Sequence, residues 1–434
     1  MTEGQVSPPL AQRARALRSS VIRDILKLTQ RPGMISLAGG LPAPDTFPLE
    51  LLRAGFDRVL TEHGRAALQY STTEGHPPLR EWIAARETAR GIPTRADEVL
   101  IVSGSQQALD LIAKALVEPG APVLVEAPTY LGALQAFSLF APTWRMVPTD
   151  DGGLMPDALT TDLTQSARFL YAMPNFQNPS GRTLTHERRS ALAERARRHD
   201  FWIIEDDPYG ELWYEAVPPP SLRAFACERV IRMGSFSKVL APGLRLGYVI
   251  APEPVIATLA RLKQATDLHT ATVTQMAAYD VLAGGHLDTL LPLTRRRYAQ
   301  QCAALLDALD QFFAGRGHWT RPAGGMFVWV ELAATVDATA LLAQAVKRQV
   351  AFVPGAAFYP LGARANTLRL SFVTVAAEQL HVGIERLARC LDEPVAHAAT
   401  HSETDPKVDA ANGAAAASAS PRNDDASRAP AANR

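Results

Sequence analysis

Short apolar runs alternate with amphipathic stretches through the first two thirds of the chain. The first three runs are each followed by a stretch of helical periodicity, and three more runs follow; the runs lie at 99–102, 122–125, 169–172, 201–204, 230–233 and 246–250. Apolar runs of this length predict buried strands. Their alternation with helices predicts an α/β fold in which helices cover both faces of a mostly parallel sheet.

The pattern changes after residue 288. A long amphipathic helix is predicted over 290–313, and strands and helices then follow without strict alternation, which is typical of a smaller α+β domain. We expect four parts: an N-terminal segment, 1–48, with a short helix that belongs to the small domain and the cleft; a large domain, 49–288; a small C-terminal domain, 289–392; and a tail, 393–434. The tail is rich in Ala, Ser, Asp and Pro, which predicts disorder.

Composition narrows the possible partners. The 44 basic and 44 acidic residues cancel, so no overall field favours nucleic acid or an anionic membrane. The three cysteines are too scattered for a disulfide framework or a zinc site. Without an apolar run of about 18 residues or an N-terminal apolar signal region, we expect a cytoplasmic protein that binds small molecules and no metal.

One stretch of candidate chemistry surrounds Lys238. This lysine lies between hydroxyl residues just after the apolar run 230–233, so we expect it in a loop at the carboxyl end of a strand, where open α/β sheets bind ligands. An amine there can form a Schiff base with an aldehyde cofactor, while Ser235, Ser237 and Arg245 could bind a phosphate. A solvated loop with a structural arginine is the alternative.

Other predicted strand ends carry side chains that could complete such a site. Ser105 and Gln106 open a helix whose free amides could hold an anion, although many helices begin this way. Asp206 could pair with a pyridine nitrogen and keep it protonated, which makes the ring an electron sink. Asp206 and Asp207 could instead bind a metal, but no clustered His or Cys accompanies them.

Aromatic, amide and arginine side chains add further candidates. Tyr130 could stack on a planar cofactor or be a half-buried core tyrosine. Asn178 and Tyr209 could reach a phenolic oxygen, although Asn178 also begins an Asn-Pro-Ser-Gly sequence that is typical of a turn. Arg369, on an apolar strand, suits a bidentate grip on an α-carboxylate if it faces the cleft and not solvent. Gly40 follows another glycine, which allows either close backbone approach to a ligand or a simple turn.

Together these motifs resemble the pyridoxal-phosphate-dependent aminotransferases of fold type I, specifically the 2-aminoadipate and kynurenine aminotransferase group. The resemblance extends from residue 20 to about 391 and rests on eight ordered motifs: Leu-Ala-Gly-Gly-Leu-Pro at 37–42, Leu-Gln-Tyr-Ser at 68–71, Gly-Ser-Gln-Gln-Ala-Leu at 104–109, Glu-Ala-Pro-Thr-Tyr at 126–130, Gln-Asn-Pro-Ser-Gly at 177–181, Glu-Asp-Asp-Pro-Tyr at 205–209, Gly-Ser-Phe-Ser-Lys at 234–238 and Asn-Thr-Leu-Arg-Leu-Ser at 366–371.

The resemblance implies a role for each candidate in holding pyridoxal 5′-phosphate. Lys238 would bind its aldehyde, Asp206 its pyridine nitrogen, Tyr130 its ring face, and Asn178 and Tyr209 its phenolic oxygen. The phosphate would be held by Ser105, Gln106, Ser235, Ser237 and Arg245, joined by Tyr70 from the neighbouring subunit of a homodimer.

The resemblance also implies a reaction. The amino group of an L-amino acid, such as 2-aminoadipate, glutamate or an aromatic or aliphatic donor, would pass to a 2-oxo acid with ping-pong kinetics. Arg369, Asn178 and Gly40 would contact the substrate. Arg23, on the mobile N-terminal helix, is similar in position to an arginine that grips a distal carboxylate in the aminoadipate enzymes, or is a surface charge.

Four other functions are alternatives to transamination. An acyltransferase such as the 8-amino-7-oxononanoate synthases would place a histidine where Tyr130 stands; a β-lyase remains an alternative. A transcriptional regulator would need a basic helical module before the first motif, and only about 20 residues precede it. A cofactor-binding protein without catalysis would not need both Lys238 and Asp206.

Overall fold

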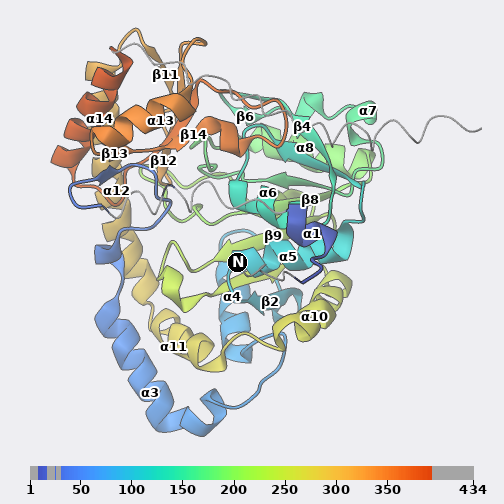
Figure 1. Cartoon of the computed structure of the whole chain (residues 1–434). Helices are drawn as coiled ribbons and strands as arrows, with labels where there is room; N and C mark the ends of the chain where they lie inside the picture. The colour runs from blue at the N-terminus through green and yellow to red at the C-terminus, as the bar shows by residue number, and fades with distance from the viewer. Residues whose placement is uncertain (1–7, 17–24, 26–30, 393–434) are drawn as a thin grey trace, which may run out of the picture. The chain divides into compact units, whose positions relative to one another are not determined.

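A seven-stranded sheet forms the centre of the fold (Figure 1). The structure is a computed structural model, and it describes residues 8–16, 25 and 31–392. The strand order is β2-β10-β9-β8-β7-β3-β4, with bounds β2 (Val99–Val102), β3 (Pro122–Glu126), β4 (Thr143–Val147), β7 (Phe169–Ala172), β8 (Trp202–Asp206), β9 (Val230–Ser235) and β10 (Gly247–Ile250). All of these strands are parallel except β10, which runs antiparallel to both of its neighbours. The predicted α/β fold with a mostly parallel sheet is confirmed.

Helices cover both faces of this sheet, which explains why strands such as β2 and β7 are buried along their whole length. Neighbouring residues of β8 belong to different hydrophobic clusters: Ile203 shares a cluster with Leu192, and Ile204 shares another with Leu109. The surrounding helices are α3 (Leu49–Ala67), α4 (Pro77–Ala89), α5 (Ser105–Leu116), α6 (Leu131–Ser138), α7 (Thr161–Thr164), α8 (His186–Arg198), α9 (Leu222–Phe225), α10 (Glu253–Asp267) and α11 (Thr272–Ala283).

A second, antiparallel sheet lies in the C-terminal third, in the order β11-β12-β15-β14. Its strands are β11 (Gly317–Trp319), β12 (Phe327–Leu332), β14 (Val353–Pro354) and β15 (Thr367–Ser371), and its helices are α12 (His286–Phe312), α13 (Ala338–Lys347) and α14 (Ala377–Leu391). The larger sheet falls within the range predicted for the large domain and this sheet within the range predicted for the small one. The domain boundaries themselves stay a prediction.

Short elements complete the described chain. Two strands, β1 (Ile35–Ser36) and β13 (Val350–Ala351), pair in parallel and join the N-terminal part of the chain to its C-terminal third, whereas β5 (Thr149–Asp150) and β6 (Gly153–Leu154) form a hairpin. Helix α1 spans Gln12–Ala16. The predicted helix over 21–28, with Arg23, and the predicted disordered tail lie outside the described residues.

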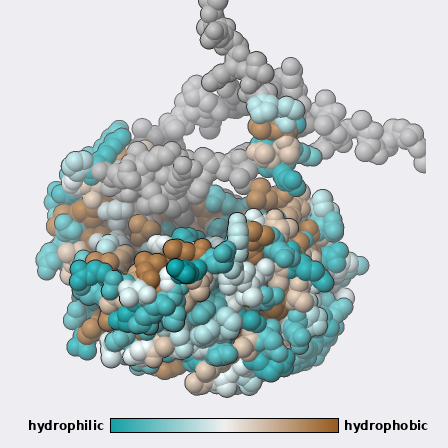
Figure 2. All heavy atoms as spheres, turned by 90° about the horizontal axis from the view of Figure 1, so that it is seen from below, coloured by the Kyte–Doolittle hydropathy of each residue, from teal (hydrophilic) through white to brown (hydrophobic). Residues whose placement is uncertain are grey.

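The surface is mixed in character. Figure 2 views the molecule from below, where hydrophobic residues are interspersed among hydrophilic ones. No helix in the described part of the chain has both the length and the apolar character to span a membrane.

Candidate active site

A cavity of about 310 Å³ lies where β8 and β9 end. Its size is typical of a small-molecule site. Every predicted site residue except Tyr70 and Arg23 lines this cavity. The lining residues are Gly40, Leu41, Ser105, Gln106, Tyr130, Met173, Asn178, Asp206, Pro208, Tyr209, Ser235, Ser237, Lys238, Pro242, Arg245 and Arg369. Tyr70 lies after α3 with 77% of its surface exposed, and Arg23 falls outside the described residues.

Lys238 lies in the turn after β9, and its Nζ donates a 2.7 Å hydrogen bond to the carbonyl oxygen of Gly40. Burial, followed by the nearby charges of Arg369 and Arg245, lowers the pKa of Lys238 to about 8, while Asp206 opposes this shift. A lysine is a nucleophile only in its neutral form. Its surroundings therefore bring the amine close to the neutral form at physiological pH.

The lowered pKa of Lys238 predicts how the protein captures an aldehyde. The rate at which cofactor-free protein binds pyridoxal phosphate should rise about tenfold per pH unit up to about pH 8, where the amine becomes neutral, and level off above. Stopped-flow absorbance between pH 6 and 10 measures this rate. A plateau reached only near pH 10 would show that the site does not lower the pKa of this lysine.

Asp206 is the last residue of β8, and its carboxylate is buried. Burial raises the pKa of Asp206 to about 7; the hydroxyl of Tyr171, which donates a 2.7 Å hydrogen bond to Asp206 Oδ2, opposes this. One hydrogen bond from a neutral group offsets only a small part of the desolvation cost of a buried, ionised carboxylate. The site therefore fits a cationic partner such as a protonated ring nitrogen.

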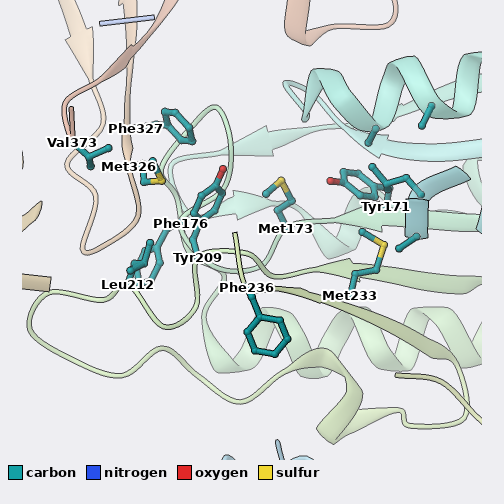
Figure 3. Packing of buried hydrophobic residues seen from close by; sticks show 14 of the residues in the cluster. Tyr171, Met173, Phe176, Tyr209, Leu212, Met233, Phe236, Met326, Phe327 and Val373 are labelled. Atoms are coloured by element: carbon teal, nitrogen blue, oxygen red, sulfur yellow. The ribbon is translucent and has the colours of Figure 1, made fainter. Parts of the chain in front are cut away.

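Tyr171 was missed as a site residue by the sequence analysis, which placed it only within a strand. Figure 3 shows Tyr171 among the buried hydrophobic residues of the core. Its place on β7 opposite Ile204 of β8 brings its hydroxyl to Asp206, two residues further along β8. A tyrosine within an otherwise apolar strand was the available signal, because a buried hydroxyl needs a polar partner.

Backbone amides and basic and hydroxyl side chains form an anion cradle beside Asp206. Helix α5 begins after Gly104 without a side-chain cap, so its first amides are free for an anion. Gly104 has a φ of +84°, and a Cβ at this position would lie 2.4 Å from Arg245 Nη2. Only glycine lets this guanidinium reach the helix start. With Ser235 and Ser237 on the same cavity wall, the cradle fits a phosphate.

Arg369 reaches the cavity from β15 and is 1% exposed. Its Nη1 donates to Asn178 Oδ1 at 2.8 Å and its Nη2 to the Ala38 carbonyl oxygen at 2.7 Å, but its buried Nε has no partner among the described residues. Burial lowers the pKa of Arg369 to about 10. An unpaired buried donor on a guanidinium that no described carboxylate neutralises fits a substrate carboxylate.

Two tyrosines and an amide line the remaining wall. Tyr130 precedes α6, and Gly132 makes room for its ring, because a Cβ there would lie 2.5 Å from Tyr130 Cζ. Burial raises the pKa of Tyr209, so the phenol stays protonated and can donate. Since the amide oxygen of Asn178 is bound to Arg369, the Asn178 amide nitrogen is left as a donor toward a phenolic oxygen.

The metal alternative for the two aspartates does not fit the geometry. Asp206 lines the cavity, whereas Asp207 Oδ2 accepts a 3.0 Å hydrogen bond from Arg232 Nη2. Across residues 8–16, 25 and 31–392, no group of His, Cys, Asp and Glu could hold a metal ion.

Comparison with known proteins places the chain among related sequences over most of its length. The sequence model of "Aminotransferase class I and II" matches residues 34–387. Aromatic-amino-acid aminotransferase 1 of Thermococcus litoralis is 42% identical, with 88% of this chain and 94% of the relative covered. The 2-aminoadipate transaminase of Thermus thermophilus is 44% identical, with 87% and 95% covered. The crystal structure of Pyrococcus horikoshii kynurenine aminotransferase superposes with a TM-score of 0.85 at 40% identity, covering 88% of this chain and 96% of that chain.

Proposed function

The chain belongs to the class I and II aminotransferases, so it is a pyridoxal-phosphate-dependent enzyme that moves amino groups from amino acids to 2-oxo acids, and we propose that the cavity around Lys238 is its active site. The observation that carries this proposal is the convergence of a half-buried lysine, a buried aspartate, an anion cradle and a buried arginine with an unpaired nitrogen. Each of these groups matches one part of the cofactor or the substrate.

We propose the following roles for these residues. Arg245, Ser235, Ser237 and the first turn of α5 bind the phosphate, and Asp206 binds the ring nitrogen. Tyr130 lies against the ring, while Asn178 and Tyr209 donate to the phenolic oxygen. Arg369 binds the substrate α-carboxylate, next to the backbone of Gly40. When bound, pyridoxal phosphate delocalises the electrons released at the substrate Cα and so makes the Cα proton removable.

The catalytic steps of this chain then fall to Lys238. Its neutral Nζ would bond to the cofactor aldehyde with release of water and would be freed when the substrate amine took its place. As a free base it would accept the proton from the substrate Cα and pass it to the cofactor carbon that bears the amino group. With an accepted 2-oxo acid, the same Nζ would carry a proton in the opposite direction, to the substrate Cα. The Gly40 carbonyl oxygen accepts a hydrogen bond from Nζ at 2.7 Å, so it can hold the lysine beside the substrate Cα between the two proton transfers.

The described cavity walls support a broad range of amino donors. Arg245 and Arg369 are assigned to the phosphate and the α-carboxylate, and Leu41, Met173 and Pro208 leave apolar surface for a side chain. The relatives compared above are named for aromatic amino acids, 2-aminoadipate and kynurenine. We therefore assign aromatic and aliphatic donors to the apolar walls, and 2-aminoadipate and glutamate to a distal grip by Arg23.

The half-reaction tests this donor range. Holoenzyme without 2-oxo acid is mixed with single amino acids, namely 2-aminoadipate, glutamate, leucine and kynurenine, and both the visible absorption of the bound cofactor and the 2-oxo acid released are followed. Loss of the absorption with stoichiometric 2-oxo acid ranks the donors. A complete lack of reaction with all four would contradict the proposed range.

Arg23→Ala separates the two donor classes. Loss of a charge-assisted contact with a distal carboxylate should lower kcat/KM for 2-aminoadipate and glutamate about tenfold or more, while leucine changes less than twofold. The half-reaction with each donor measures this split. An equal loss on dicarboxylic donors and leucine would exclude the distal role of Arg23.

Arg369→Lys tests the carboxylate grip. Lysine keeps the charge but cannot bind Asn178, Ala38 and a carboxylate in one plane, so kcat/KM should fall about 10- to 100-fold for every donor. Steady-state kinetics with leucine and 2-aminoadipate measures the loss. If the loss affected only one donor, Arg369 would bind a side chain and not the α-carboxylate.

We also propose a cytoplasmic homodimer that acts in amino acid biosynthesis. Leu68 and Tyr70 expose 72% and 77% of their surfaces on the segment after α3, and large exposed side chains of this kind are typical of interfaces. In such a dimer, Tyr70 would reach the phosphate site of the other subunit. Sedimentation of the holoenzyme measures the assembly, and a Tyr70→Phe variant that binds the cofactor as tightly as wild type would contradict this contact.

A further inference from the structure

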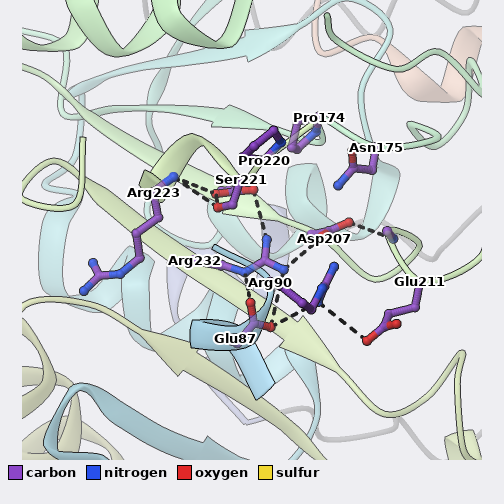
Figure 4. Close-up of polar contacts among 12 residues, drawn as sticks. Glu87, Arg90, Pro174, Asn175, Asp207, Glu211, Pro220, Ser221, Arg223 and Arg232 are labelled. Atoms are coloured by element: carbon purple, nitrogen blue, oxygen red, sulfur yellow. Dashed lines mark hydrogen bonds and ion pairs between the residues drawn. The ribbon is translucent and has the colours of Figure 1, made fainter. Parts of the chain in front are cut away.

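A buried charge network lies behind Asp206, on the side of the sheet away from the cavity. Strand β8 ends in Glu205 and Asp206, and Asp207 follows; because side chains alternate along a strand, Asp206 faces the cavity while its two neighbours face the other way. Arg232 of β9, which is 1% exposed, meets both neighbours: Nη1 donates to Glu205 Oε1 at 2.9 Å and Nη2 to Asp207 Oδ2 at 3.0 Å (Figure 4).

The same guanidinium also reaches helix α4. Its Nε donates to Glu87 Oε2 at 3.2 Å, and Tyr248 of β10 donates its hydroxyl to Glu87 Oε1 at 2.6 Å. The Tyr248 ring in turn lies on Gly234, where a Cβ would be 2.1 Å from Tyr248 Cζ. Gly234 directly precedes Ser235, on the strand that leads to Lys238. The network thus joins the segments that carry Asp206 and Lys238.

Stability alone does not account for such a network. Well-packed apolar side chains in place of buried charges are often neutral or stabilising, because the desolvation cost disappears. A planar guanidinium that bonds three carboxylates nevertheless fixes their relative positions more tightly than apolar packing does. Since two of the three carboxylates flank Asp206 in the chain, the position fixed here is that of Asp206.

We propose that Arg232 is a positioning residue for the cofactor: it holds the end of β8 so that the Asp206 carboxylate is aimed into the cavity, and it holds β9 so that Lys238 faces the same point. This inference rests on the proposed role of Asp206. Arg232 touches neither the cavity nor the reacting atoms, so it acts through its neighbours.

The charge of Arg232 contributes as well as its geometry. Arg232 lowers the pKa of Asp206, whereas Asp207 and Glu205 raise it. Without Arg232, the negative charges of Asp207 and Glu205 would oppose ionisation of Asp206, and the positive charge that now offsets them would be missing. The other titratable or charged groups that the structure brings against Asp206 are Tyr171 of β7, Tyr130 before α6, Tyr209 in the loop after β8, and Lys238 after β9.

The test uses Arg232→Lys in the holoenzyme loaded with pyridoxal phosphate that is ¹⁵N-labelled at the ring nitrogen. The ¹⁵N shift reports protonation of that nitrogen, and equilibrium dialysis gives the affinity for pyridoxal phosphate. We expect the variant to fold, its signal to move toward the neutral ring, and its cofactor affinity to fall about tenfold. An unchanged ¹⁵N shift with affinity within twofold of wild type would overturn the proposal.

A second variant and two controls separate the possible causes. Arg232→Met removes the charge as well as the geometry. If Arg232→Met does not fold, Tyr248→Phe serves as a milder change to the network. A ¹⁵N shift that equals wild type in both Tyr248→Phe and Arg232→Lys contradicts the proposal. Arg223→Lys is the matched control, because Arg223 is also buried but directs its guanidinium to Glu98 and to the carbonyl oxygens of Cys227 and Val230, and to neither carboxylate beside Asp206; the ¹⁵N shift of this variant should not move. If the ¹⁵N shift is unchanged in both Asp206→Asn and Arg232→Lys, Asp206 does not bind the ring nitrogen. If the shift moves in Asp206→Asn but not in Arg232→Lys, only the positioning role of Arg232 is wrong.

Discussion

Replacement of Lys238 by alanine should abolish the visible absorption of the bound cofactor and lower turnover by at least roughly four orders of magnitude. A positioned general base contributes up to about 10⁴-fold, and this variant also loses the nucleophile. The variant should fold, because the described contact of Nζ is a single hydrogen bond to the Gly40 carbonyl oxygen. Absorption spectra of the purified variant with pyridoxal phosphate, and half-reaction rates with leucine, measure both losses.

Lys114→Ala is the matched control for this experiment. Lys114 lies on α5, outside the cavity, where it pairs with Asp110 on the same helix at 2.5 Å. Exposed pairs of this kind contribute little, so the control should keep its spectrum and turnover. If Lys238→Ala retained turnover within tenfold of wild type, Lys238 would not be the catalytic amine and the proposed active site would be wrong.

The main elements of the fold could be predicted from the sequence because local patterns determine them. The apolar run at 99–102 has the predicted bounds in the structure, and the helix predicted to open at Ser105 begins at that residue. The helix predicted at 290–313 begins earlier, at His286, because Gly285 adopts a left-handed conformation directly before it. Helix ends depend on such single-residue conformations and are therefore predicted less well than helix centres.

Strand pairing could not be predicted in the same way. The antiparallel direction of β10 depends on its place between β2 and β9, which are distant in sequence from each other. Strand β4 was not predicted, because its sequence Thr-Trp-Arg-Met-Val has no continuous apolar run; it is an edge strand with a single neighbour. Pairing of this kind is set by tertiary contacts and not by local propensity.

In the candidate site too, some residues could be predicted from local sequence and others depend on tertiary contacts. Sequence motifs, most of them at strand ends, named the polar residues that line the cavity, because parallel strands bring their carboxyl ends to one edge of a sheet, whereas Leu41, Met173, Pro208 and Pro242 of the lining were not named. The residues behind them were not named: Tyr171 and Arg232 lie in the middle of apolar runs, where the sequence indicates only burial. Their roles become visible through distances to Asp206, Glu205 and Asp207.

Asp206→Asn should reduce activity and yet stabilise the cofactor-free protein. Asparagine has the same shape and can still accept the Tyr171 hydrogen bond, but it carries no charge for the ring nitrogen. Loss of one preorganised electrostatic contact typically costs about 10²- to 10³-fold in kcat, and we expect a loss of this size. The half-reaction with leucine measures it, and Asp200→Asn, an exposed acid paired with Arg229, is the control.

The stability effect has the opposite sign because the pKa of Asp206 is raised. A buried carboxyl whose pKa is about 7 in the folded state, against an ordinary value of 3.8, destabilises the fold progressively as pH rises from about 4 to about 7. The asparagine variant lacks this penalty. Its Tm without cofactor should therefore exceed that of wild type by a margin that grows over this range and is constant above pH 7. If the variant and wild type had the same Tm at pH 5 and again at pH 8, burial would not hinder the ionisation of Asp206. The cavity would then not need a cationic partner.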